Sequence, residues 1–297
     1  MEEDIQEPTR QSSQEQKLSR FFFKFRFILF HIIFLSATWF VAPTRTTIVA
    51  GIALYLIRMF GVTGGYHRYF AHRTYKTSRV FAFVMAFLAQ SSAQRGIIWW
   101  ASNHRHHHRF SDRPEDLHSP VQRGFLYSHV GWLFEPSSYT KRQNVADLER
   151  VPELCWLDKH PMFPAIVLGI LCWLLWGWSG LVYSFGISTI VLFHATFTIN
   201  SLSHVWGHRS YETDDDSRNN FFLALITLGE GWHNNHHRYM RSARQGFVWW
   251  QIDITYTILL VLEKCSLVWD IRHVPESIKK ERKNSSNLFS SVFYHDK

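Results

Sequence analysis

The most constraining feature of this chain is a long stretch without charge. No Asp, Glu, Lys or Arg occurs in the 49 residues from His160 to His208. Because a membrane-crossing helix needs about 20 apolar residues, this stretch is long enough for two crossings. It predicts a helical hairpin in a membrane, with its turn near residues 177–180 or 183–186. The alternative, a pair of buried helices in a large soluble core, is less favoured by the length of the stretch.

A second apolar pair lies near the N-terminus. Residues 27–44 carry no charge, and residues 46–63 are apolar except for Arg58, which we expect to snorkel or to pair with another group. A short turn is predicted around residues 43–47. Together the two pairs predict an all-α membrane protein with four transmembrane helices in two hairpins. The apolar stretch 80–90 is too short to span a bilayer and is predicted to be a re-entrant or interfacial helix.

Basic residues predict the orientation of these helices. Four of them lie directly before the first apolar segment, within residues 17–26, whereas only Arg45 lies in the first turn. By the positive-inside rule the N-terminus is therefore cytosolic. Four crossings then place both termini and both long loops, 67–159 and 204–297, in the cytosol. The four basic residues are Lys17, Arg20, Lys24 and Arg26.

We expect a polar cytosolic tail over residues 1–20, a membrane domain with a helical cytosolic cap over residues 21–275, and a second polar tail over residues 276–297. The first tail is partly acidic, which is not typical of a cleaved signal peptide. The net charge of +8 is spread through the loops and no nucleic-acid motif occurs, so a nucleic-acid partner is not expected. An anionic lipid surface or a phosphate-bearing substrate is favoured. The three cysteines show no C-x-x-C spacing.

Eight histidines in three groups predict a metal site. Two copies of H-x-x-H-H occur, at residues 104–108 and 233–237, and a looser pair bounds the stretch H-R-Y-F-A-H. In a helix, positions i, i+3 and i+4 share a face, so we expect the three imidazoles of each copy to converge on one small volume. The looser pair is five residues apart, so it requires a helix end or serves different metals. The histidines are His67, His72, His104, His107, His108, His233, His236 and His237.

A single histidine is most often a core or surface residue with a satisfied hydrogen bond, but three groups with repeated spacing favour metal binding. Imidazole binds zinc, copper, iron and nickel, so ligand type does not choose among them. Eight candidates exceed the four ligands of a tetrahedral zinc site, which favours a two-metal centre. Asn200 and His204 share a helical face and are further candidates, with His208 as the alternative. His106 points away from its neighbours and is expected to have at most a supporting role.

Five motifs carry a resemblance to a known family. They are H-R-Y-F-A-H-R-T-Y-K, N-H-R-H-H-H-R-F-S-D, R-G-F-L-Y-S-H-V-G-W, N-S-L-S-H and G-E-G-W-H-N-N-H-H. In this order and spacing they resemble the membrane fatty acid desaturases of the stearoyl-CoA (acyl-CoA Δ9) type. The resemblance implies an oxidoreductase of lipid metabolism that uses two iron ions, O2 and two electrons to remove two hydrogens from an acyl chain.

The resemblance also implies roles for individual residues. The iron ligands would be the eight histidines named above and His204, with Asn200 acting through water. The bend of the family's substrate tunnel matches Gln94, Trp100 and Thr196, for which ordinary helix packing is an equally good explanation. Iron suits this chemistry, because it is redox-active and can activate O2 for C–H cleavage where zinc cannot.

Two departures from the family pattern bear on the partners. Ser102 and Asn103 stand where animal acyl-CoA desaturases carry an Arg-Asp pair that contacts coenzyme A. The acyl carrier is therefore coenzyme A, a lipid or a carrier protein, with acyl-CoA favoured. No H-P-G-G haem motif occurs, since His160-Pro161 leads into an apolar segment. We expect electrons from a separate protein, a cytochrome b5 or a ferredoxin.

The expected reaction is the introduction of a cis double bond, at the Δ9 position, into a long-chain acyl substrate. Two alternatives share the histidine framework, a di-iron lipid hydroxylase and a desaturase of sphingolipid type. A zinc-dependent membrane protein, either a transporter or a hydrolase, is a third. Transporters place their ligands within the spans near the bilayer midplane, whereas these histidines are expected in cytosolic segments.

Overall fold

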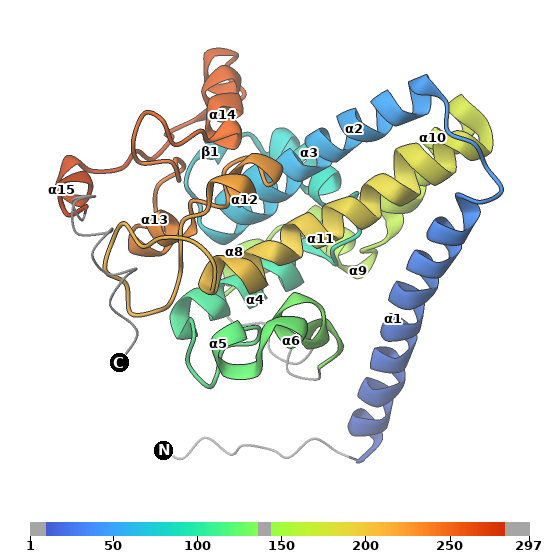
Figure 1. Ribbon diagram of the computed structural model, residues 1–297, viewed down its shortest axis with the longest axis horizontal. Coiled ribbons are helices and arrows are strands. Elements are labelled where there is room, and N and C mark those ends of the chain that lie inside the picture. Colours follow the sequence, from blue (N-terminus) through green and yellow to red (C-terminus); the bar gives the residue numbers. More distant parts are fainter. Residues whose placement is uncertain (1–9, 136–143, 283–297) are drawn as a thin grey trace, which may run out of the picture.

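The computed structural model describes residues 10–135 and 144–282, which are mostly helical (Figure 1). In chain order the elements are α1 (Arg10–Ala37), α2 (Arg45–Phe60), η1 (Gly61–Ala71), β1 (Lys76–Thr77), α3 (Arg79–Gln90), α4 (Ile97–Phe110), α5 (Pro120–Arg123), α6 (Phe125–His129), η2 (Gly131–Phe134), α8 (Ala146–Glu149), α9 (Pro152–Lys159), α10 (Phe163–Ser179), η3 (Gly180–Ile187), α11 (Ser188–Ser201), η4 (Leu202–His204), α12 (Phe221–Ile226), α13 (His233–Arg238), α14 (Ile254–Lys264), β2 (Val268–Trp269) and α15 (Glu276–Lys280).

The first apolar pair is formed by α1 and by α2 with its continuation η1. α1 starts at Arg10, inside the segment expected to be a polar tail, and ends at Ala37. Thr44 caps α2, because its hydroxyl accepts the backbone N–H of Thr47 at 3.1 Å. The connection therefore covers residues 38–44, slightly earlier than the expected turn, since a cap rather than the apolar run decides where α2 begins.

The second apolar pair reverses direction at Gly177. This residue has φ 58° and ψ −150°, a backbone conformation that only glycine adopts readily. The chain then returns along itself, because a Cβ atom on Gly169 of α10 would lie 3.3 Å from the ring of Phe185 in η3. The hairpin is therefore confirmed, with its turn at the first of the two predicted positions.

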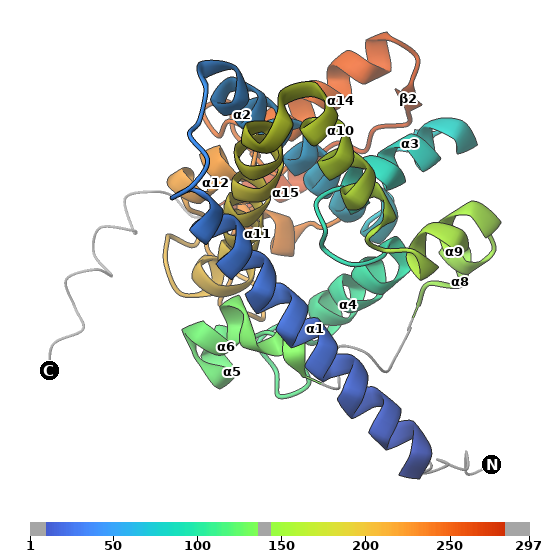
Figure 2. The ribbon, with the colours of Figure 1, turned by 90° about the vertical axis from the view of Figure 1, so that its right-hand side faces the viewer.

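By length and composition, two helical stretches among the described residues could cross a membrane, Arg45–Ala71 and Phe163–His204. The second of them contains the reversal at Gly177 and so consists of two antiparallel segments. Figure 1 shows both interhelical turns at one end of the molecule and α4 and α13 at the other. In Figure 2 the N-terminal end of α1 extends away from the remaining helices. The arrangement of four transmembrane helices remains a prediction.

Arg58 does not snorkel, and within residues 10–135 and 144–282 it forms no ion pair with a carboxylate. Its side chain is completely buried in α2, and its guanidinium donates to the hydroxyls of Ser188 and Thr189 and to the carbonyl of Leu54. The bond to Thr189 is 2.6 Å long. Of the two predicted outcomes, pairing is therefore correct, and the pairing joins α2 to α11.

The remaining elements form a cap at the end of α2 and α11 that lies far from the turns (Figure 1). The predicted short apolar helix is present as α3. β1 pairs antiparallel with β2, with Lys76 opposite Trp269, which adds a very small sheet to a fold that was predicted to be all-α. α4 and α13 carry the two H-x-x-H-H motifs into this cap.

Candidate metal centre

All nine histidines that were predicted as ligands lie in two groups. Within each group the nitrogen atoms available for a metal lie within 4.8 Å of one another. The two groups adjoin, since the ring centroids of His108 and His237 are 4.4 Å apart. The first group contains His67, His72, His104, His108 and His236, and the second contains His107, His204, His233 and His237.

The two H-x-x-H-H motifs divide their histidines between the groups. In α4, the i and i+4 residues His104 and His108 belong to the first group, and His107 belongs to the second. In α13 the assignment is reversed, since His236 alone joins the first group. The expectation that each motif converges on one volume is therefore wrong. Neighbours at i+3 and i+4 differ by about 100° around the helix axis, so a wide face can serve two adjacent centres.

His67 and His72 meet because the helix that carries them is wound as a π-helix. η1 covers Gly61–Ala71, and the backbone N–H of His72 donates to the carbonyl of His67 at 3.0 Å, a step of five residues. Wider winding brings residues five apart onto nearly the same face, and such segments are frequent at functional sites. Both histidines belong to the first group. The predicted helix end is also present, because His72 caps η1.

The spacing of the ring nitrogens fits a metal ion. The Nε2 atoms of His72 and His104 are 2.8 Å apart, and that of His108 lies 3.1 Å from that of His104 and 2.9 Å from that of His236. Imidazole nitrogens bound at about 2.1 Å and 90° apart would be about 3 Å from each other. In the second group the Nε2 atoms of His204 and His233 are 3.1 Å apart. The donor set therefore suits two ions held by imidazole.

Carboxylates fix four of these rings through the other nitrogen. In each pair the Nδ1–H donates to a carboxylate oxygen, which leaves the Nε2 lone pair directed at the centre. The pairs are His67 with Glu230 (2.5 Å), His107 with Asp116 (3.0 Å), His204 with Asp112 (2.8 Å) and His237 with Asp215 (2.5 Å). Every one of these side chains is at least nine-tenths buried.

Burial keeps most of the rings uncharged, as metal ligands must be. Burial, strengthened by the neighbouring imidazoles, lowers the pKa of five of them well below the usual value and that of His237 to about 4. Burial also opposes protonation of His107, but the Asp116 carboxylate outweighs it and raises the pKa of this ring. Although burial of Asp112 opposes its ionisation, its hydrogen bond with His204 brings its pKa down to about 2. The five are His72, His104, His108, His233 and His236.

Two asparagines position α13. The Oδ1 of Asn234 accepts the backbone N–H groups of Ser210 and Tyr211, both at 2.8 Å. The Nδ2 of Asn235 donates to the carbonyl of Gln245 at 2.8 Å and to the side chain of Gln251 at 2.9 Å. The Asn-Asn pair inside H-N-N-H-H is therefore a structural element that sets the direction of its three histidines.

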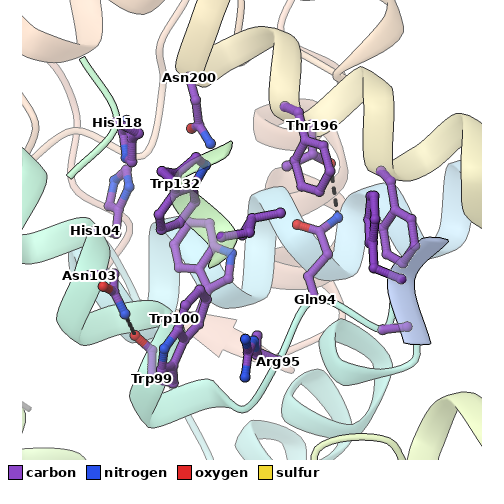
Figure 3. Close-up of a pocket in the computed structure, with 15 residues that line it drawn as sticks. Gln94, Arg95, Trp99, Trp100, Asn103, His104, His118, Trp132, Thr196 and Asn200 are labelled. Carbon is purple, nitrogen blue, oxygen red and sulfur yellow. Dashed lines mark hydrogen bonds between the residues drawn. The ribbon is translucent and has the colours of Figure 1, made fainter. Parts of the chain in front are cut away.

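The remaining candidates are placed as follows. Asn200 lies in α11 with its side chain in a cavity beside the centre (Figure 3). His204, and not His208, joins the second group, because His208 forms a backbone bridge with Asn219 instead. His106 points away from both groups and bonds the carbonyl of Glu115 at 2.9 Å. A water-mediated role for Asn200 remains a prediction.

A largely aromatic cavity ends at the first histidine group (Figure 3). The space between its lining atoms is about 610 Å³, part of it open to solvent. Gln94, Trp100 and Thr196 all line it, and the Nε2 of Gln94 donates to the hydroxyl of Thr196 at 3.1 Å. Other lining residues are Phe27, Trp99, Trp132, Phe193 and Phe197, together with His104 and Asn200.

Trp100 connects the cavity wall to the centre. Its ring stacks on His104, with centroids 4.9 Å apart, and on Tyr66, with centroids 5.2 Å apart. The Tyr66 hydroxyl donates to the carbonyl of Arg95 at 2.6 Å, which fixes the loop that carries Gln94. The three residues predicted to contact substrate thus share one cavity, which is mainly apolar and includes His104 of the first histidine group in its lining.

Sequence reasoning missed the carboxylates and one histidine. Asp112, Asp116, Asp215 and Glu230 were not singled out, although acidic residues near histidine motifs are typical partners of ligand histidines. His118 was also missed. It is 4% exposed and lines the cavity, and the centroid of its ring lies 4.3 Å from that of His107.

Comparison with known proteins agrees with this geometry. The fatty acid desaturase family model matches residues 43–259. The chain is 39% identical to Delta-9 acyl-lipid desaturase 2 of Arabidopsis thaliana over 77% of its own length and 75% of that protein. It is 33% identical to an sn-2 palmitoyl-lipid 9-desaturase of Nostoc sp. over 81% and 86% of the two chains. It is 36% identical to an acyl-CoA 5-desaturase of Anemone leveillei over 77% and 72%.

The match covers every histidine of both groups, all of which lie between residues 67 and 237. The relatives are named as desaturases of fatty acyl groups, and the apolar cavity beside a histidine centre suits such a substrate. This chain belongs to the fatty acid desaturase family and is an oxidoreductase of lipid metabolism.

Proposed function

We propose that this enzyme introduces a cis double bond at the Δ9 position of a long-chain acyl group. The observation that carries the proposal is the junction between the centre and the cavity, since His104 belongs to the first histidine group and also lines the apolar cavity. In the overall reaction, O2, two electrons and two protons convert –CH2–CH2– into –CH=CH– and release two water molecules. A separate protein, a cytochrome b5 or a ferredoxin, supplies the electrons.

The two histidine groups would each hold one iron ion, with Asn200 contributing through water to the second. When bound, iron supplies the oxidising power that cleavage of an unactivated C–H bond requires. The chain's own residues hold and orient the rings. Carboxylates on Nδ1 of four rings keep their Nε2 atoms directed inward, and burial keeps most of the rings neutral.

The cavity would position the acyl chain. Aromatic walls bury an apolar chain, and the hydrogen bond between Gln94 and Thr196 joins the loop before α4 to α11 across the cavity. An acyl chain that passes the Gln94–Thr196 hydrogen bond would then run along the ring of Trp100, which stacks on His104. We infer that these three residues select which methylene pair faces the centre.

The proposals for the acyl carrier and for the position of the double bond have different grounds. The relatives include enzymes named for acyl-CoA and for acyl-lipid substrates, and for positions 5 and 9. We propose Δ9 from the motif resemblance and acyl-CoA as the favoured carrier, with a lipid-linked chain as the alternative.

We also propose a four-span topology with the centre and both termini in the cytosol. His67 follows Arg45 by 22 positions along α2 and η1, which is at most about 33 Å at the α-helical rise of 1.5 Å per residue, because the π-helical part is wound more tightly along its axis. His204 follows Gly180 by 24 positions along η3, α11 and η4, or about 36 Å at the same rise. Both distances match a hydrocarbon core of about 30 Å. Exposed side chains such as Ile52 would then face lipid.

The test is the fatty acid profile of desaturase-deficient cells that express the chain, with the double bonds located by mass spectrometry. New cis monounsaturated acids with the double bond at carbon 9 are expected, and none with the His236→Ala variant. Hydroxylated acids would show the related hydroxylase activity instead. Unchanged lipids together with bound zinc in place of iron would support the zinc-dependent alternative.

A further inference from the structure

A second hollow also reaches the histidine centre. It shares no lining residue with the aromatic cavity, and the space between its lining atoms is about 750 Å³, part of it open to solvent. His108 and His237 line it, so it touches one member of each histidine group. The described part of the chain therefore has two separate approaches to the centre.

The two approaches meet at one point. His104 lines the aromatic cavity and His108 lines the second hollow, yet their Nε2 atoms are only 3.1 Å apart. The two residues are one helical turn apart in α4, which thus forms the partition between the hollows. An ion held by the first group would be reachable from both sides.

The two approaches differ in chemistry. The walls of the first are mainly Trp and Phe side chains, which suit an acyl chain. The second is lined by side chains of both charge signs, among them Arg109, Arg113 and Asp214, and Met240 also lines it. Charged walls retain water and admit small polar species. An acyl chain in this hollow would stay in contact with water, so its entry there is not favoured.

The reaction needs such a route. Two protons must reach the centre and two water molecules must leave it in every turnover, while the acyl chain occupies the aromatic cavity. Burying an acyl chain excludes water from the walls that it covers. We propose that the second hollow is the aqueous port of the centre, through which hydrated metal ions enter during loading and protons and product water pass during turnover. The turnover part of this proposal rests on the proposed desaturation.

The experiment closes the port and measures metal exchange. In a chain whose three native cysteines are replaced, Met240→Cys is labelled with a bulky hydrophilic maleimide, and Arg150→Cys, exposed and outside the hollow, receives the same label as the matched control. Release of bound Fe²⁺ to a hydrophilic chelator is followed in detergent, each variant being compared with its own unlabelled form. The label on Met240→Cys is expected to slow release by roughly tenfold, equivalent to a barrier about 1.4 kcal/mol higher.

Three further measurements make the result decisive. Binding of an unreactive acyl analogue should be unaffected by the label, and filling the aromatic cavity with that analogue should leave metal release unchanged. If the cysteine-free chain does not fold, Met240→Trp against Met162→Trp, two methionines of similar exposure, provides the same comparison. Equal release from labelled and unlabelled Met240→Cys, or slower release only on filling the aromatic cavity, would overturn the port. Slowed release from the labelled form, together with no desaturation by the unlabelled chain, would instead contradict the proposed function alone.

Discussion

At the scale of single residues, the hydrogen bond that Nδ1 of an imidazole donates determines the direction in which its Nε2 points. Asp112 shows this most clearly, because its Oδ2 accepts Nδ1–H of His204 at 2.8 Å and the backbone N–H of Asp216 at 2.8 Å. Its backbone has φ 57°, a left-handed conformation that Asp and Asn tolerate better than other side chains. An amide can therefore replace this carboxylate without strain.

Asp112→Asn is expected to lower metal affinity by roughly 10–100-fold, since it weakens the partner that orients a ligand ring. Titration of the metal-free protein with Fe²⁺ measures this directly. Asp216→Asn is the control, because the Asp216 side chain is 44% exposed and, among the described residues, its carboxylate forms an ion pair only with Arg209, at 3.7 Å. Equal affinity in the two variants would show that the carboxylate does not orient His204.

His107→Ala and His236→Ala are expected to lower activity by more than about 100-fold, because even the loss of an outer partner of a ligand costs 10–100-fold. Membrane insertion should be unchanged, since neither residue lies in an apolar helix. His106→Ala is the matched control from the same motif, as this ring bonds a carbonyl outside both groups. Product analysis and metal content of purified variants check the expectation, and full turnover by His236→Ala would contradict the ligand assignment.

Six of the nine grouped histidines could be predicted to lie together because their spacing repeats within a few residues. The carboxylate partners of the grouped histidines could not, since His67 and Glu230 are 163 residues apart and only the fold brings them to 2.5 Å. His118 was overlooked for a different reason. It is an isolated histidine outside any repeat, and only its position on the cavity wall distinguishes it.

At the scale of elements, the winding and splitting of helices shape the centre. Sequence periodicity assumes 3.6 residues per turn, so it could not foresee that η1 is wound as a π-helix. The H-x-x-H-H spacing in an α-helix is compatible with one centre or with two, so it could not decide that α4 and α13 divide their histidines between two groups. The hairpin turn was predictable, because a glycine inside an apolar run marks a place where the backbone can reverse, as Gly177 does.

The hydrogen bond between Gln94 and Thr196 is an element-scale feature, because it joins the loop before α4 to α11 across the cavity. Thr196→Ala removes the acceptor of the 3.1 Å bond from Gln94. We expect a mixture of double-bond positions with little loss of stability, about 0.5–1.5 kcal/mol for one hydrogen bond. Thr198→Ala is the control, since its hydroxyl bonds only within α11, to the carbonyl of Ala195. The measurement is the position of the double bond in the products. A single, unchanged position with Thr196→Ala would exclude a role for the Gln94–Thr196 hydrogen bond in regioselectivity.

At the scale of the whole molecule, the length of the apolar segments sets the architecture, and the cap carries the histidine groups. The uncharged run from His160 to His208 correctly predicted the helical hairpin, because apolar length is a property of composition alone. The cap could not be predicted in the same way. Its short helices are held by side-chain networks such as that of Asn234 and Asn235, which carry no periodic signal.

The last prediction concerns the stability of the metal-free protein. Burial lowers the folded-state pKa of several cap histidines, that of His237 to about 4 and that of His118 to about 3. Below about pH 6.5 the unfolded chain binds protons that the folded chain does not, so stability rises with pH and falls as the solution is acidified. Each such group contributes up to about 1.4 kcal/mol per pH unit between its two pKa values.

Thermal unfolding of the metal-free protein between about pH 5 and 8 should therefore show a midpoint that drops steeply below about pH 6.5 and levels off above it. His118→Asn should make the drop shallower, because it removes one group with a lowered pKa. His106→Ala should leave the slope unaltered, since that ring is outside both groups and bonds only a loop carbonyl. A midpoint that rises on acidification would mean that the buried rings are protonated in the folded state, and the inward-facing lone pairs on which metal binding depends would then be absent at neutral pH.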